Sequence, residues 1–303
     1  MPRRTPWLAL SLSVLMGAAL TAPAAAQAPA DTLTRIRDTR SITLGVREAS
    51  RPFSFVNDQK QSVGYSVDLC LAAVEEIKRT LKLPDLKVNY KLVSGAERIP
   101  KLEAGEIDLE CGSTTNTKAR QEKVAFSYTI FVAGIRVLVP KGTKMDSVKD
   151  LTGLPVAISK GTTSEKLFNQ LNANDVKMQL QTFASNGEAY KALKEGKVRA
   201  FPQDDSLLMG LAAYDNALDS LSLSTAVLSV EPYAIMMRKG DTALGAIVDR
   251  SLGRLYSSGE IEVLYKKWFA TDRLTIQMSR LTRDSFTRPN KEAGVAMLLG
   301  YSI

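Results

Sequence analysis

The chain has 303 residues and a formal net charge of +8, with two cysteines and no histidine. Its lysines and arginines are spread along the sequence and are not interleaved with aromatic residues, which argues against a nucleic-acid-binding surface. Without histidine, the chain lacks the residue that most often acts as a general acid or base. We expect no metal, no cofactor and no catalytic residue.

The N-terminus has the pattern of a secretory signal. Arg3 and Arg4 precede a short apolar stretch at 8–20, and small residues follow at 24–26. A transmembrane helix needs roughly 20 consecutive apolar residues, and this stretch is interrupted by serines. We therefore expect a signal peptide at 1–26, export to the periplasm and no membrane span after cleavage. The loss of two arginines and no acid would lower the formal charge to +6.

Strands and helices alternate along the rest of the chain, which is near the length at which a single core splits into domains. In the first unit we expect strands at 42–46, 88–93 and 107–110, helices at 67–81 and 99–103, and then a long apolar run at 131–139. In the second unit we expect strands at 156–159, 179–183 and 198–201, helices at 161–171 and 187–195, an apolar run at 233–237, and helices at 242–258 and 260–269. This alternation predicts α/β lobes with mostly parallel sheets.

Both cysteines fall in the first unit. Cys70 lies in a helical pattern, and Cys111 ends a predicted strand. Export places the chain in an oxidising compartment, which favours pairing of cysteines that meet. We expect a disulfide, and the alternative is a pair of buried, unpaired thiols.

Two helix starts carry groups that suit a small carboxylic acid, an amino acid above all. At the first, Ser113 and Thr115 offer hydroxyls, and the Arg120 guanidinium matches a carboxylate in two parallel bonds. At the second, residues 161–165 combine a flexible glycine, a capping-box spacing and the free N–H groups of a helix start. Taken alone, each helix start is better explained as a plain helix cap than as a binding site, and Thr117 would be the cap of the first. Their occurrence together strengthens the binding interpretation.

Eight collinear segments resemble the periplasmic solute-binding proteins of ABC importers for polar amino acids, among them those for glutamate and aspartate. The segments are GVREASRPFSF at 45–55, VGYSVDL at 63–69, ERIPKL at 97–102, ECGSTTN at 110–116, AFSYTIFV at 125–132, KGTTSE at 160–165, QDDSLL at 203–208 and SGEIEVLYKKWF at 258–269. No single segment is decisive, but the conserved order of all eight is specific. The resemblance covers residues 33–285.

The resemblance implies an α/β, two-lobed periplasmic-binding-protein fold of type II, with two crossover hinge strands and the ligand in the cleft between the lobes. It places lobe 1 at 33–132 and 236–303 and lobe 2 at 133–235, with crossings near 127–137 and 230–237. We expect the apolar end of the tail, 295–299, to pack on lobe 1. The implied partners are a small-molecule amino acid and an ABC permease in the inner membrane, and we expect a monomer.

The resemblance also assigns contacts to an amino-acid head group. The α-carboxylate would be held by Arg120 with Thr115 and Thr163, and the α-ammonium by Asp204 with help from Ser113. A buried zwitterion needs both of its charges paired, because an unpaired buried charge is costly. The alternative for Asp204 is a cap on the helix that follows it.

The side chain of the ligand would meet Arg47 and Arg98 through its carboxylate, and Phe53 or Phe55 along its aliphatic stem. Exposure to solvent is the alternative for each arginine. Two positions depart from the family's acidic-ligand members: Gly95 stands where they have serine, with Ser94 adjacent, and Asn186 stands where they have histidine. Asparagine can donate a hydrogen bond but cannot become a cation.

Glutamate or aspartate is therefore the expected ligand, and a binding protein for glutamine, asparagine or another polar amino acid is the alternative. A periplasmic dehydratase-like enzyme on the same fold is the alternative of another class, because a fold does not fix a function. Its proton donor would have to be Glu48 or Glu231, and nothing in the sequence around either residue marks it for that role. We expect a binding protein and no enzymatic activity.

Overall fold

The computed structural model describes residues 31–174, 176–297 and 301–302. The predicted signal peptide at 1–26 lies outside this part of the chain. Among the described helices, none combines the length and the apolar character that a bilayer crossing requires.

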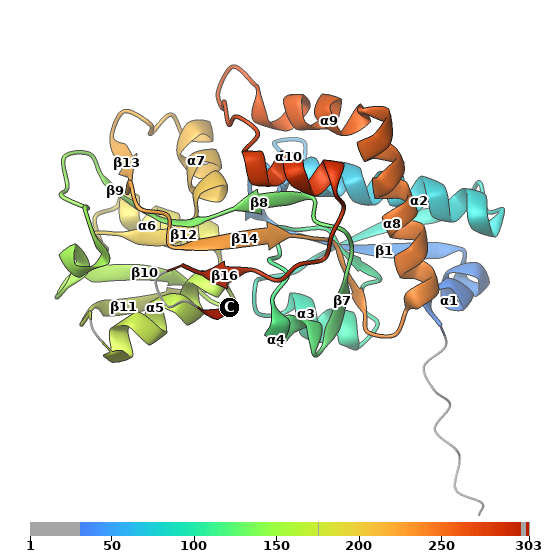
Figure 1. Ribbon diagram of the computed structural model, residues 1–303, viewed down its shortest axis with the longest axis horizontal. Coiled ribbons are helices and arrows are strands. Elements are labelled where there is room, and N and C mark those ends of the chain that lie inside the picture. Colours follow the sequence, from blue (N-terminus) through green and yellow to red (C-terminus); the bar gives the residue numbers. More distant parts are fainter. Residues whose placement is uncertain (1–30, 175, 298–300, 303) are drawn as a thin grey trace, which may run out of the picture. The chain divides into compact units, whose positions relative to one another are not determined.

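The first lobe is built on a five-stranded sheet with the strand order β5-β1-β6-β15-β7 (Figure 1). The parallel strands are β5 (Lys87–Leu92), β1 (Ser41–Val46) and β6 (Leu109–Glu110). The strand β15 (Met236–Arg238) runs antiparallel to β6 and to β7 (Val124–Phe126). The three strands that follow β1 in the chain form a small antiparallel sheet: β2 (Ala49–Ser50), β3 (Ser54–Val56) and β4 (Ser62–Val63).

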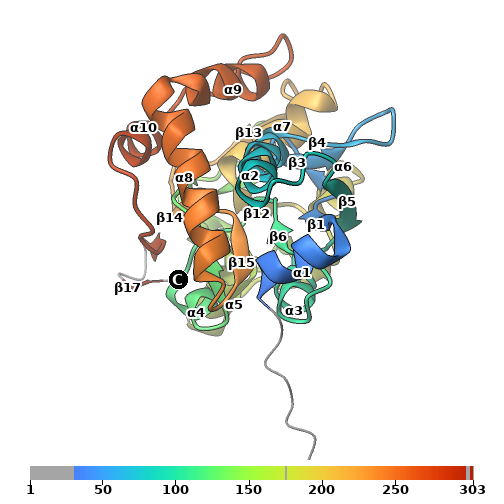
Figure 2. The same ribbon diagram turned by 90° about the vertical axis from the view of Figure 1, so that its right-hand side faces the viewer.

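Helices cover both faces of the five-stranded sheet. On one face α2 (Tyr65–Leu81) and α8 (Thr242–Ser258) pack side by side, as Figure 2 shows. They share one buried apolar cluster with α9 (Glu260–Phe269) and α10 (Arg280–Thr287). On the other face α3 (Arg98–Glu103) packs in a separate cluster, and α4 (Lys118–Gln121) contacts β7.

The second lobe contains a parallel pair and an antiparallel group of strands. The pair is β10 (Pro155–Ser159) with β11 (Gln179–Phe183), and the group is β12 (Phe201–Asp204), β9 (Ile135–Pro140) and β13 (Leu221–Leu223). Its helices are the 3-10 helix η1 (Val148–Leu151), α5 (Thr163–Asn174), α6 (Asn186–Lys194) and α7 (Asp205–Tyr214). The prediction of mostly parallel sheets is therefore wrong for β12 and β13, which both pair antiparallel with β9.

The helices at 242–258 and 260–269 and the strand at 179–183 have the predicted bounds. The strand predicted at 198–201 is wrong, because ladder pairing with β9 begins only at Phe201 and Ala200 makes a single bridge to Val156. The apolar run at 131–139 is divided at Gly134 into β8 (Phe131–Ala133) and β9. A Cβ atom at Gly134 would lie 2.4 Å from Val227 Cγ1 and 2.9 Å from the Ser229 carbonyl oxygen, so a larger residue here would force the neighbouring segment to shift.

The two lobes are joined by β8 continuing into β9 and by β14 (Ser229–Tyr233) continuing toward β15. A third segment also reaches the second lobe, which corrects the expected placement of the tail. The strand β16 (Val295–Ala296) pairs with β14, Ala296 lies in the apolar cluster of the second lobe, and β17 (Tyr301–Ser302) pairs with β16 (Figure 1). The open edge of β14 offers unpaired backbone groups, and β16 satisfies them.

Buried apolar clusters divide near the predicted lobe boundaries. One cluster extends from Leu33 to Ala133 and returns at Tyr233, with Leu207 of the second lobe packed into it. The clusters of the second lobe lie between Ile135 and Leu228, with Ala296 of β16 added to one of them. We keep 33–132 with 236–303 and 133–235 as our proposal for the lobes, amended by the placement of β16.

Cys70 of α2 and Cys111, directly after β6, form a disulfide with their Cα atoms 6.1 Å apart. The bond joins the helix to the strand end from which Ser113 and Thr115 follow. It therefore fixes the backbone that carries these two hydroxyls.

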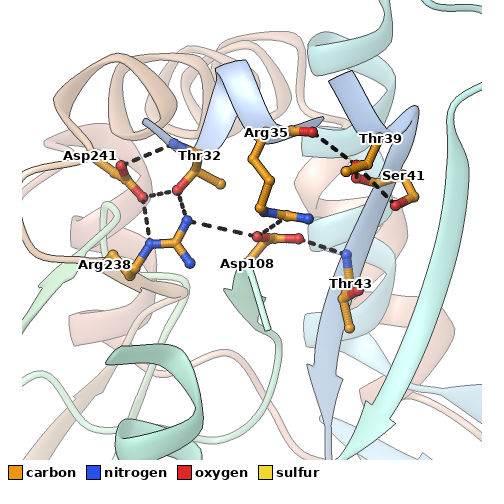
Figure 3. A network of polar contacts seen from close by, with 8 residues as sticks. All are labelled: Thr32, Arg35, Thr39, Ser41, Thr43, Asp108, Arg238 and Asp241. Carbon is orange, nitrogen blue, oxygen red and sulfur yellow. Dashed lines mark hydrogen bonds and ion pairs between the residues drawn. The ribbon is translucent and has the colours of Figure 1, made fainter. Parts of the chain in front are cut away.

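A polar network ties α1 (Thr32–Thr39) to the sheet of the first lobe (Figure 3). The buried Asp108 carboxylate accepts a hydrogen bond from the Thr43 N–H at 2.8 Å and pairs with Arg35 and, at 3.9 Å, with Arg238. Arg238 also pairs with Asp241 at 3.5 Å. Three segments far apart in the sequence thus depend on one carboxylate.

We expect Asp108→Ala to lower the free energy of unfolding by about 2–3 kcal/mol, because it leaves Arg35 and a buried backbone N–H without their partner and removes one of the two carboxylates that pair with Arg238. Denaturant unfolding of the variant and the wild type measures this loss. Asp85→Ala is the matched control: Asp85 pairs with Arg40 at 3.9 Å, and both side chains are largely exposed. It should cost under about 1 kcal/mol, and equal losses in the two variants would contradict the importance of the network.

Candidate functional site

A narrow cavity lies where the two lobes meet. It is lined by Arg47, Arg98, Ser113 and Thr115 of the first lobe and by Thr162, Thr163, Asn186, Gln203, Asp204 and Leu207 of the second. The cavity thus brings together all the predicted site residues except Phe53 and Arg120. The space inside that the centre of a water-sized molecule can occupy is about 10 Å³, so an amino acid can enter only if the lobes move apart.

Phe53 is not placed to contact a ligand, and that prediction is wrong. Its fully buried ring packs in the aromatic core of the first lobe, with ring centroids 4.9 Å from Phe131 and 5.0 Å from Tyr233. The apolar residue in the cavity lining is Leu207 of α7. Phe55, the other candidate, lies beside Trp268 and under the Arg51 guanidinium, away from the cavity.

Arg120 lies beside the cavity and bridges the lobes. Its Nη1 donates to the Thr115 carbonyl at 2.9 Å, and its Nη2 donates to the Gly161 carbonyl of the second lobe at 3.1 Å. The backbone around it is fixed by Thr117, whose side chain accepts from the Arg120 N–H at 3.2 Å, as the cap pattern predicts. The guanidinium fork is thus held within reach of both lobes.

Arg98 also crosses to the Gly161 carbonyl, which its Nη2 reaches at 3.2 Å. Its Nη1 donates to the Thr114 hydroxyl, which in turn donates to the Glu110 carboxylate at 2.7 Å. The neighbouring Arg47 is buried, yet within the described part of the chain its guanidinium has no hydrogen-bond partner. Solvent exposure, the alternative considered for both arginines, is excluded.

Three guanidinium groups therefore lie close together in a desolvated place. Burial, with a smaller contribution from the charge of Arg98, lowers the pKa of Arg47 to about 10 and that of Arg120 to about 9. Burial also lowers the pKa of Arg98, and Glu110 opposes this shift. An anion bound among them would favour their charged forms, because an opposite charge offsets desolvation.

Asp204 ends β12 and brings a carboxylate to the opposite wall. Its Oδ2 accepts a hydrogen bond from the Tyr233 hydroxyl of the hinge, and its buried Oδ1 has no partner among the described residues. It makes no side-chain cap to α7, which excludes the capping alternative. Burial, and next the charge of Glu231, raises the pKa of Asp204 well above its usual value.

Glu231 is a site residue that the sequence analysis did not assign to the ligand-binding set. It lies fully buried on β14, and its Oε2 accepts from Thr115 of the first lobe at 2.5 Å and from Thr163 of the second at 2.9 Å. Burial raises its pKa. The available signal was an acid inside an otherwise apolar run, 228–237.

Gln203 is a second unassigned residue of the site. Its Nε2 donates to Asn186 Oδ1 at 3.0 Å, and its Oε1 accepts from the Asp204 N–H at 3.0 Å.

At the start of α5 the expected capping box is altered. The Glu165 N–H donates to the Thr162 hydroxyl, but the Glu165 carboxylate accepts from Gly161 rather than from Thr162.

Glycines allow the lobes to touch through their backbones. A Cβ atom at Gly95 would lie 2.5 Å from the Lys160 carbonyl oxygen, and one at Gly161 would lie 2.5 Å from Gly95. Gly210 of α7 meets the Arg51 carbonyl in the same way, at 2.4 Å. Contact between the lobes therefore explains why position 95 has glycine instead of serine. A Cβ atom there would also lie 3.8 Å from Arg47 Nη2.

Metal ligands are not gathered anywhere in the described chain: no group of three or more aspartate, glutamate, cysteine or histidine residues there could hold an ion.

We expect Gly95→Ala to weaken binding of an acidic amino acid, the predicted ligand, about 10-fold. The added methyl group would meet Lys160 only when the lobes close, and overpacking at such a contact is destabilising. Calorimetric titration measures the affinity. Gly253→Ala on α8 is the control, because a Cβ there meets nothing within 4 Å; equal affinities in the two variants would contradict the proposed contact.

Comparison with known proteins identifies the family. Residues 42–271 match bacterial extracellular solute-binding proteins, family 3. The chain is 41% identical over 260 residues to the L-glutamate/L-aspartate-binding protein of Pseudomonas aeruginosa, covering 85% of this chain and 86% of that one. It is 35% identical over 300 residues to the glutamate/aspartate import solute-binding protein of Escherichia coli, covering 97% of this chain and 99% of that one.

A solved structure shares the fold. The crystal structure of an ancestral amino acid-binding protein, a precursor of cyclohexadienyl dehydratase, superposes with a TM-score of 0.68 at 30% identity. The match covers 78% of this chain and 99% of that one. With its two lobes and the cavity between them, the chain belongs to the bacterial extracellular solute-binding proteins, family 3.

Proposed function

We propose that this protein is the periplasmic substrate-binding component of an ABC importer and that it binds glutamate or aspartate between its lobes. The observation that carries the proposal is a cavity lined by Arg47, Arg98 and Asp204, with Arg120 beside it and the buried Oδ1 of Asp204 unpaired among the described residues. This pattern complements two carboxylates and one ammonium group. Two relatives that cover most of the chain are named for binding the same two amino acids.

The head group would lie between Arg120 and Asp204. The Arg120 fork already binds two carbonyl oxygens, so an α-carboxylate could take the place of these weaker, uncharged acceptors. Asp204 Oδ1 has no competing donor and could accept from the α-ammonium group. Thr115, Thr163 and Ser113 surround this position in the cavity lining.

The side-chain carboxylate would lie against Arg47 and Arg98. Arg98 already has oxygen partners on both lobes, whereas Arg47 is buried with its guanidinium unengaged. The charge of Glu110 offsets only part of the cost of burying Arg47, whose pKa stays lowered to about 10, and an acidic side chain would supply a second carboxylate. An amide would supply only a dipole, which favours glutamate and aspartate over glutamine and asparagine.

Transport would depend on hinge closure. Ligand contacts from both lobes stabilise the closed state, and a ligand shifts the population only by its preference for that state. In the closed structure the direct contacts between lobes, such as those to the Gly161 carbonyl, lie at the same place as the proposed ligand contacts. We propose that a permease in the inner membrane recognises this closed form and that the protein acts as a monomer.

We propose no enzymatic activity, although one structural relative is described as the precursor of a dehydratase. Of the two carboxylates considered as proton donors, Glu48 is exposed and lines the neighbouring pocket. Glu231 is held by two hydroxyl donors on the hinge. Turnover of a prephenate-like acid would overturn this part of the proposal.

Calorimetric titration of ligand-stripped protein with glutamate, aspartate, glutamine and asparagine tests the function. We expect tight binding of the two acids and at least about 10-fold weaker binding of the amides, because the amides bring no carboxylate to the buried guanidinium groups. Equal or tighter binding of the amides would overturn the acidic-ligand assignment. Binding of none of the four would overturn the proposed site.

Ligand-free closure should depend on pH. Burial in the closed form raises the pKa of Asp204, so closure takes up a proton, is favoured at low pH and is lost as the pH rises through the raised pKa. We expect the radius of gyration from small-angle X-ray scattering to be smaller at pH 5 than at pH 8. In Asp204→Asn, which stays neutral, most of this dependence should disappear, apart from the parallel contribution of Glu231. A wild-type radius that does not change with pH would contradict the prediction.

A further inference from the structure

We propose that Gln203 is a positioning residue: it fixes which end of the Asn186 amide faces the ligand and thereby makes the site select a carboxylate over a carboxamide. This inference rests on the proposed function and names the feature that would decide between the acidic and the amide ligands. It concerns Asn186, which departs from the histidine of acidic-ligand members, and Gln203, to which the resemblance assigns no role.

The orientation of both amides follows from one backbone group. The Asp204 N–H can only donate, so the Gln203 atom facing it at 3.0 Å must be the oxygen Oε1. The other end of Gln203 is then the donor Nε2, and the Asn186 atom facing it at 3.0 Å must be the acceptor Oδ1. The Nδ2 group of Asn186 is left without a partner among the described residues.

That free amide group faces accessible space beside Arg47. Asn186 and Arg47 both line the cavity between the lobes and also a neighbouring pocket of about 210 Å³. Both residues are nearly fully buried, at 3% and 5% exposure, so little bulk solvent reaches them. Asn186 is further fixed because it opens α6, whose cap Ser185 accepts from the Glu188 N–H.

At its side-chain end, the cavity between the lobes presents the guanidinium groups of Arg47 and Arg98 beside the Asn186 amide, while the carboxylates of Glu48 and Glu97 line only the neighbouring pocket. A carboxylate has acceptor oxygens only and can satisfy both the Asn186 amide and the Arg47 guanidinium. A carboxamide would bring its own NH₂ group against them and leave at least one buried donor unpaired, which is the costly outcome for a polar site. The fixed asparagine thus presents the same polarity as a protonated histidine would, without needing the charge.

Gln203 is placed to have this role and little else. Its side chain is 1% exposed, and its two hydrogen bonds go to the Asp204 backbone and to Asn186. Without these bonds Asn186 could rotate and present its oxygen to the cavity. An acceptor at that position would suit the NH₂ group of glutamine or asparagine.

Gln203→Met tests the inference by removing both bonds at similar volume. We expect the ratio of glutamine to glutamate dissociation constants, measured by calorimetry, to fall about 10-fold from its wild-type value. A merely structural role would weaken both ligands equally and leave the ratio unchanged, and that result would overturn the inference. Gln179→Met is the matched control: its side chain donates to the Gly153 carbonyl far from the cavity, and its ratio should equal that of the wild type.

Asn186→Leu asks the same question without altering Gln203 or adding a charge, and it decides the matter if Gln203→Met does not fold. The leucine removes the amide donor at similar volume, so the affinity for glutamate should fall about 10-fold more than that for glutamine. Equal losses would overturn the inference. If the wild type binds neither acid, the proposed function fails; if it binds them and both variants keep the ratio, only the positioning role fails.

Discussion

Desolvated charge at the junction of the two lobes is the constraint on which the rest of this structure depends. The first lobe contributes the guanidinium groups of Arg47, Arg98 and Arg120 together with the Glu110 carboxylate, and the second contributes Asp204. In the closed form the arginines reach the Gly161 carbonyl across the cleft, and the Glu231 carboxylate on the hinge accepts hydroxyls from both lobes. On closure, desolvated polar groups thus exchange one set of partners for another. A zwitterion with an acidic side chain would add carboxylates for the arginines and an ammonium group for Asp204.

The backbone makes this redistribution possible. Glycines at 95, 161 and 210 let the main chains of the two lobes approach to distances that a Cβ atom would forbid, so side chains from both lobes reach one small cavity. The disulfide between Cys70 and Cys111 and the network around Asp108 fix the first lobe behind that cavity. The hinge strands β8 and β14, together with β16, then connect two bodies that are each stabilised by their own apolar core.

Much of the site could be predicted because its residues fall in short segments of fixed local geometry. Ser113 and Thr115 follow a strand, Arg120 lies on a helix capped by Thr117, and Thr163 opens a helix, so local pattern and family resemblance place them together. The predicted ligand contact of Phe53 is wrong because an apolar ring suits a protein core as well as a binding pocket. Only the packing of Phe131 and Tyr233 around the ring shows that it belongs to the core. Glu231 and Gln203 were left out because their roles come from partners more than fifteen residues away in the chain.

The sequence by itself determined the alternation of strands and helices, the family and most of the residues that line the cleft, because these depend on periodicity and on short collinear segments. The tertiary structure alone decided that the strands around β9 run antiparallel, that β16 crosses to the second lobe and that Gly95 lies between the lobes. It also decided the direction of the Asn186 amide, which depends on a chain of hydrogen bonds that begins at the Asp204 backbone. Such properties arise from contacts between distant segments, and no local pattern of residues specifies them.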